Sequence, residues 1–156
     1  MRILKGLGAA LCALTALALI AMATPARAQA PHYLDALSDL RTARDYIKSD
    51  HRPEYDGQRH HALDEINKAI DEIKQAAWDD GKNTKWAPPA SPVTDPWQPE
   101  RMAANWLAEA LKQLSTSEEQ QSANHALQQR AIQHVAEARL AVGGLIRMSG
   151  HSHHWS

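Results

Sequence analysis

Two stretches of the chain place apolar residues at alternating intervals of four and three residues. This spacing puts side chains on one face of an α-helix, so each stretch predicts an amphipathic helix. Small and bulky residues alternate along each face, which lets two helices approach closely at the alanines. The second stretch repeats the first at a constant offset of 69 residues. The paired positions are Ala62 and Ala131, Ile66 and Val135, Ala69 and Ala138, Ile73 and Val142, and Ala76 and Leu145.

Two shorter amphipathic stretches, residues 33–47 and 100–114, precede the two long ones. Pro53 suits the first position of the second helix, and Gly81 suits its C-terminal stop. Residues 115–117 are followed by glutamates at the spacing of an N-terminal capping box, which predicts that the fourth helix begins there. The pattern therefore predicts four helices.

Residues 82–99 interrupt the pattern with five prolines and no helical period. We expect an extended connection that crosses the bundle, pinned by Trp86 and Trp97. The constant offset predicts that the flanking halves are related helical hairpins. The expected fold is therefore an all-α four-helix bundle made of two related hairpins joined by a Pro-rich linker, with the bundle at residues 29–149.

Two local features do not suit a helix. Asp79 and Asp80 lie at the C-terminal end of the second helix, where the helix dipole disfavours negative charge, so they suggest a site or a cationic neighbour. Gly143 and Gly144 lie inside the fourth helix and cost roughly 2 kcal/mol of helix propensity. Either that helix ends at the glycines, or a ligand or another backbone approaches closely there.

The chain begins with the features of a cleavable signal peptide. Arg2 and Lys5 precede an uncharged run over residues 6–23, and Ala26 and Ala28 are small residues before a cut at Gln29. The alternative is an uncleaved membrane anchor, because the apolar run is close to the shortest length that spans a bilayer. In both cases the basic flank directs the remaining residues outward. We expect residues 1–28 to be removed and the protein to be periplasmic or secreted.

Composition limits the mature chain further. Cys12 is the only cysteine and lies in the predicted signal peptide, so no disulfide, thiolate ligand or c-type haem is expected. Removing the signal's three basic residues from 17 leaves 14, against 18 acidic residues. This net acidic, mixed charge argues against a nucleic-acid partner. Once the signal peptide is cleaved, no stable membrane anchor is expected.

All nine histidines follow the predicted cleavage position. Three imidazoles at His151, His153 and His154 form a His-rich flexible tail, residues 150–156, that can bind Cu(II), Ni(II) or Zn(II) when they are neutral. His60 and His61 each have a carboxylate four residues on, which makes a second candidate pair of ligands for a divalent metal ion. The alternative is that both are solvated residues beside the helix seam.

No catalytic motif is found, so an enzyme is not expected: the chain lacks Glu-x-x-His pairs, His-Glu-x-x-His, Gly-x-Ser-x-Gly and a phosphate-binding glycine loop. The first hypothesis is a non-enzymatic exported bundle that binds a transition metal through histidines. The alternative is an envelope interaction or structural module, with Trp86 and Trp97 of the linker contacting a protein partner. A third reading is a pocket for an apolar ligand or haem inside the bundle.

Two resemblances bear on these hypotheses. The stretch Tyr33–Arg44, with Ala69–Ala77 and Asp79–Lys82, resembles a group of small exported bacterial helical-bundle proteins to which no activity is assigned. The fourth helix and the histidine tail are similar, more weakly, to a periplasmic small metal-binding protein that carries histidine at nearly every helical turn. This chain has fewer histidines than that pattern. The second resemblance implies a helical bundle that binds metal.

Overall fold

The computed structural model describes residues 32–85, 89–91, 98–116 and 124–152. Within them the fold is all-α, with four α-helices, one short 3-10 turn and no strand, as the apolar periodicity predicts. The predicted signal peptide, both linker tryptophans and the last four residues lie outside the described residues. The elements are α1 (His32–Ser49), η1 (Pro53–Tyr55), α2 (Asp56–Asp79), α3 (Pro99–Leu114) and α4 (His125–Ser152).

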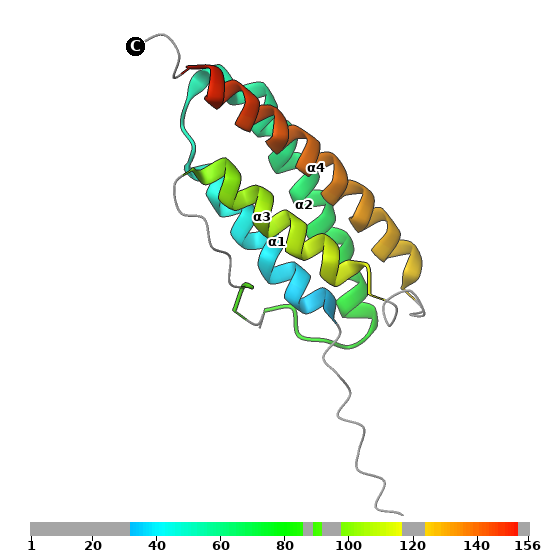
Figure 1. Cartoon of the computed structure of the whole chain (residues 1–156). Coiled ribbons are helices and arrows are strands. Elements are labelled where there is room, and N and C mark those ends of the chain that lie inside the picture. Colours follow the sequence, from blue (N-terminus) through cyan, green and yellow to red (C-terminus); the bar gives the residue numbers. More distant parts are fainter. Residues whose placement is uncertain (1–31, 86–88, 92–97, 117–123, 153–156) are drawn as a thin grey trace, which may run out of the picture.

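The four helices lie side by side in one bundle (Figure 1). α1 and α2 run in opposite directions, α3 runs the same way as α2, and α4 returns beside them. The most extensive contacts join α2 to α4 and α1 to α3, and helices consecutive in the chain contact each other less. α2 ends and α3 begins at opposite ends of the bundle, so the intervening connection spans its length, as expected.

The two matching seams form the centre of the core. Ile66 and Val135, which occupy equivalent positions, are both fully buried. All ten paired residues of the seams are at most 2% exposed. α1 and α3 complete the core with bulky side chains that are also fully buried, namely Leu37, Leu40, Ile47, Leu107 and Leu114. Burial of this apolar surface is the main source of stability in a chain without disulfides.

α2 ends where the glycine predicts. Gly81 has a φ of +67°, a left-handed conformation that glycine adopts without a Cβ clash. The amide of Lys82 donates to the carbonyl of Ala77 (2.8 Å), and the amide of Gly81 donates to the carbonyl of Trp78 (2.9 Å). This pair of hydrogen bonds is the Schellman motif, which satisfies the last carbonyls of a helix.

The prediction for the start of the fourth helix was wrong. α4 begins at His125, not at residues 115–117. Ser115 instead completes the end of α3: its hydroxyl donates to the carbonyl of Leu111 (2.7 Å) and its amide donates to the same oxygen (3.0 Å). Asn124 precedes α4, and its carbonyl accepts the first hydrogen bond of that helix, from the amide of Gln128 (3.1 Å).

Three other boundaries differ in detail from those predicted. α4 continues through Gly143 and Gly144 to Ser152, three residues into the segment expected to be a flexible tail. A Cβ at Gly144 would lie 3.3 Å from the side chain of Gln58, so the close neighbour at this glycine is a side chain of α2. Pro99, assigned to the linker, is the first residue of α3, and Pro53 starts the 3-10 turn before α2.

Across the described ranges, no helix is both long enough and apolar enough to span a bilayer.

Candidate functional site

The structure places three of the five predicted metal ligands, His60, His61 and His151, toward one end of the bundle. His60 and His61 are exposed on the second turn of α2, and His151 belongs to the last turn of α4. Because α2 and α4 run in opposite directions, these turns lie toward the same end. His153 and His154 lie outside the described residues. Within the part of the chain that the structure describes, no three His, Cys, Asp or Glu side chains are arranged to hold a metal ion.

A histidine on α4 contacts Glu65, the carboxylate four residues after His61. The Nδ1 atom of His134 lies 2.7 Å from Oε2 of Glu65 on α2. Glu65 and His134 are 69 residues apart, the offset that relates the two seams. Placing Glu65 opposite its equivalent residue therefore brings one carboxylate and one imidazole together across the main helix interface.

Basic side chains keep Glu65 ionised. Lys68 donates to Oε1 of Glu65 (2.8 Å) and also pairs with Asp64 (2.7 Å). The hydrogen bond from Lys68, followed by that from His134, holds the pKa of Glu65 below its usual value, although burial acts in the opposite direction. Glu72 and Arg130 form a second bridge between α2 and α4, with two hydrogen bonds of 2.8 Å.

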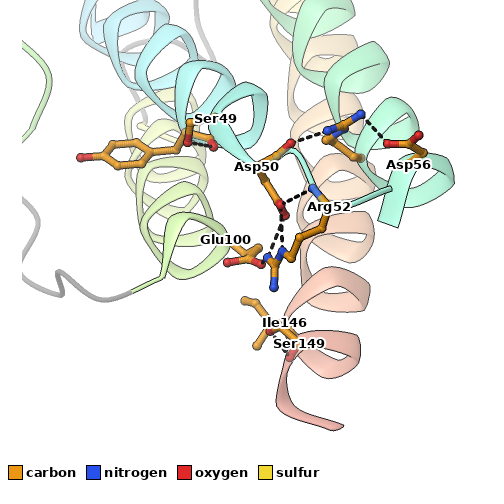
Figure 2. A network of polar contacts seen from close by, with 9 residues as sticks. Ser49, Asp50, Arg52, Asp56, Glu100, Ile146 and Ser149 are labelled. Carbon is orange, nitrogen blue, oxygen red and sulfur yellow. Dashed lines mark hydrogen bonds and ion pairs between the residues drawn. The ribbon is translucent and has the colours of Figure 1, made fainter. Parts of the chain in front are cut away.

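A buried polar network, which the sequence pattern did not predict, lies at the end of the bundle where α1 ends and α3 begins. Figure 2 shows Arg52 between Asp50 and Glu100. Arg52 donates to both oxygens of Asp50 at 2.8 Å and forms an ion pair with Glu100. Its guanidinium also lies over the ring of Tyr55, 4.4 Å from the centroid. Arg59 extends the network to the backbone carbonyl of Asp50 and to the side chain of Asp56.

Each carboxylate in this network contacts a guanidinium group. Burial acts to raise the pKa of Asp50, but hydrogen bonds from Arg52 and the charges of Arg52 and Arg59 outweigh it and hold that pKa below its usual value. The hydrogen bonds with Asp50 raise the pKa of Arg52. Glu100 is only 1% exposed, so its carboxylate depends on Arg52 for a compensating charge. This network fastens α1, η1 and α3 to one another and is structural.

The acidic residues at the C-terminal end of α2 are stabilised by nearby hydrogen-bond donors. The carboxylate of Asp80 accepts hydrogen bonds from the hydroxyl of Tyr33 on α1 and from the side-chain amide of Asn124 (2.9 Å). Asn124 also donates to the carbonyl of Ala76 (3.2 Å). Asp79 accepts a hydrogen bond from Gln75 (2.8 Å). These acidic residues therefore have neutral donors, and Asp80 joins the start of α1 to the end of α2 and the start of α4.

The described parts of the linker are fastened to α1. Asp39 is fully buried and accepts two hydrogen bonds from Ser91, one from the amide (2.7 Å) and one from the hydroxyl (2.9 Å). Burial raises the pKa of Asp39, and the two hydrogen bonds reduce that effect. Arg41 donates to the carbonyl of Thr84 (2.9 Å). The connection is held against the bundle at both points.

The sequence contained usable signals for part of what was missed. Asp50 and Arg52 fall in the break between two helices, two residues apart, where an acidic and a basic side chain can pair locally. Glu100 lies one residue after Pro99, and its burial depends on which helix covers it. Trp78 lies off the apolar seam of α2, which is consistent with its 76% exposure.

No protein-family model, no curated protein and no solved structure matches this chain.

Proposed function

We propose that this protein is a non-enzymatic exported helical bundle that binds a divalent transition metal ion, Cu(II), Ni(II) or Zn(II), through histidines at one end. One observation carries the proposal. α4 ends at Ser152 toward the end of the bundle where α2 begins, so the last turn of α4, which includes His151, lies toward the turn that carries His60 and His61. Three of the five predicted ligands therefore lie toward one end of the bundle, although they are far apart in the sequence.

The polarity of α4 adds support. The C-terminal end of a helix carries a partial negative charge, which favours a cation within the last turn. α4 is held to the bundle close to that end, because Leu145 and Ser149 are buried. Neutral imidazoles are ligands for borderline metal ions.

Calorimetric titration with Cu(II), Ni(II) and Zn(II) tests the proposal on residues 29–156. We expect a form truncated after Ser149 to lose most of its affinity, and His60→Ala with His61→Ala to lose part of it. His125→Ala is the matched control, because His125 is an exposed histidine at the other end of α4. Equal and weak binding by the full and truncated forms would refute a role for the tail.

The proposed cellular setting follows from the predicted leader. Cleavage before Gln29 releases the bundle into the periplasm or outside the cell, with no anchor in the membrane. We also propose that the two halves are related hairpins. The support is that paired seam residues are buried alike and that Glu65 contacts the residue equivalent to it on α4.

The alternative function is an envelope interaction or structural module built on the linker. The contacts of Ser91 with Asp39 and of Thr84 with Arg41 favour the structural version, in which the linker is a strap along α1. Trp86→Ala and Trp97→Ala distinguish the two versions. Loss of a captured partner with unchanged stability supports an interaction surface, and loss of stability without loss of a partner supports a strap.

A further inference from the structure

Trp78 exposes a large apolar ring at the end of α2. Its side chain is 76% exposed, whereas the alanines before it are buried in the seam. The ring borders a shallow cleft of about 550 Å³, which is within the size range of small-molecule sites. The cleft is lined by Trp78, Gly81, Lys82, Asn83, Thr84 and Lys85.

Three sets of contacts hold the backbone of this cleft. Gly81 has the left-handed conformation of the Schellman motif. The side chain of Asn83 accepts a hydrogen bond from the amide of Lys85 (3.0 Å). Arg41 on α1 holds the carbonyl of Thr84 at 2.9 Å. A ligand that enters the cleft therefore meets a largely preorganised surface, which lowers the entropic cost of binding.

The charge of the cleft is positive. Lys82 and Lys85 line it, and neither forms an ion pair with another described residue. The adjacent carboxylates in the sequence, Asp79 and Asp80, are not among the lining residues, and each already accepts a hydrogen bond elsewhere. Two ammonium groups with spare donors lie beside an exposed indole. This combination suits a ligand with a flat ring face and an acidic group.

We propose that this cleft, the Trp78 cleft, binds a small anionic ring compound, with the ring stacked on the indole and the acidic group between Lys82 and Lys85. The ring can be a sugar acid or an aromatic carboxylate, because both have an apolar face and a carboxylate. The proposal is independent of metal binding. The cleft lies at the end of α2 opposite His60 and His61, so the two sites can be tested separately.

Calorimetry on residues 29–156 with two pairs of probes tests the proposal. A trisaccharide of galacturonic acid is compared with its neutral galactose counterpart, and 2-naphthoate is compared with 2-naphthalenemethanol. We expect one acidic probe to bind and its neutral partner to bind at least about tenfold more weakly, with affinity falling as salt rises. The acidic probe that binds identifies the ligand class.

Variants locate the binding. We expect Trp78→Ala, and separately Lys82→Gln with Lys85→Gln, to weaken the acidic probe at least about tenfold. Leu140→Ala and Lys48→Gln are matched controls, because Leu140 is a large apolar residue that is 69% exposed and Lys48 is an exposed lysine on another helix. Far-ultraviolet circular dichroism checks that each variant is folded. Failure of all four probes to bind at millimolar concentration, or equal binding by Trp78→Ala, overturns the proposal.

Discussion

Buried carboxyl groups in the bundle have pKa values shifted in opposite directions, according to whether their partners are charged or neutral. Asp50 and Glu100 are almost completely buried, and both pair with Arg52. Asp39 is also buried, but it accepts hydrogen bonds only from the neutral donors of Ser91 among the described residues. The first arrangement lowers the pKa of Asp50 and favours its ionised form, whereas burial raises the pKa of Asp39 and favours its protonated form.

Removal of Arg52 should therefore destabilise the protein at neutral pH. We expect Arg52→Gln to lower the free energy of unfolding by about 2 kcal/mol, less than for a fully buried pair because the Arg52 side chain is 37% exposed. Urea unfolding at pH 7 and pH 3 measures the effect, which should shrink at pH 3 as the carboxyls protonate. Arg101→Gln is the control, since Arg101 is exposed and bonds only to Gln98. Equal loss for both variants would contradict the network's role.

Removal of the Asp39 charge should instead stabilise the protein at neutral pH. The folded pKa of Asp39 is raised, so the stability it contributes is complete below the ordinary carboxyl pKa and is lost as the pH rises through the folded pKa. Asp39→Asn removes the buried charge and keeps an acceptor for Ser91. We expect this variant to unfold at a higher urea concentration than the wild type at pH 7, with the difference vanishing at pH 3. Asp35→Asn, in a half-buried position on α1, is the comparison.

At the scale of the elements, glycines with different backbone conformations should respond differently to the same substitution. Gly81 has a φ of +67°, which disfavours any Cβ, so Gly81→Ala should cost about 1 kcal/mol. Gly57 lies in α2, and an added Cβ there meets nothing within 4 Å. Gly57→Ala should therefore stabilise the protein by about 0.5–1 kcal/mol. Thermal unfolding of both variants checks the contrast, and a shift of the same sign in both would refute it.

The seam between α2 and α4 should be the most sensitive element. Ile66 is fully buried at the centre of this contact, so Ile66→Ala should lower the free energy of unfolding by about 3 kcal/mol. Leu140→Ala, on the exposed side of α4, should change it by less than about 0.5 kcal/mol. Chemical denaturation followed by circular dichroism gives both values. Similar values would mean that the seam does not form the core.

Periodicity predicted these elements well because burial governs them. The seams of α2 and α4, the Gly81 stop and the length of α3 follow from local spacing and backbone preferences. The start of α4 was wrong because Ser115 has the right chemistry both for the end of one helix and for the start of the next. The structure shows that it bonds backward to Leu111. Spacing alone does not give that direction.

On the scale of the whole molecule, long-range contacts limit what sequence could predict of the sites. The Arg52 network needs α3 placed beside α1, and the Trp78 cleft needs Arg41 of α1 to hold the loop after α2. The contact of Glu65 with His134 joins equivalent positions of the repeat, but the offset alone does not give the register of two antiparallel helices. The seam positions and their burial were accessible from the sequence, and pairings between side chains of different helices were not.

Export also makes a prediction for the whole chain. We expect the protein isolated from a cell envelope or culture medium to begin at Gln29, because small residues precede that position. Intact mass spectrometry measures the start directly. Ala28→Lys should block cleavage and leave a heavier, membrane-associated form, and Ala30→Lys, after the cut, is the comparison. An unprocessed wild-type chain would favour the anchor alternative.

The crossover between α2 and α3 determines where the two termini are. Because α3 repeats the direction of α2, α1 begins at one end of the bundle and α4 finishes at the other. The 28 residues of α4 alone extend about 42 Å. The start of α1 is therefore separated from the turns that carry His60, His61 and His151 by the length of the bundle. If the leader remains as an anchor, the proposed metal ligands lie at the end of the bundle remote from the start of α1.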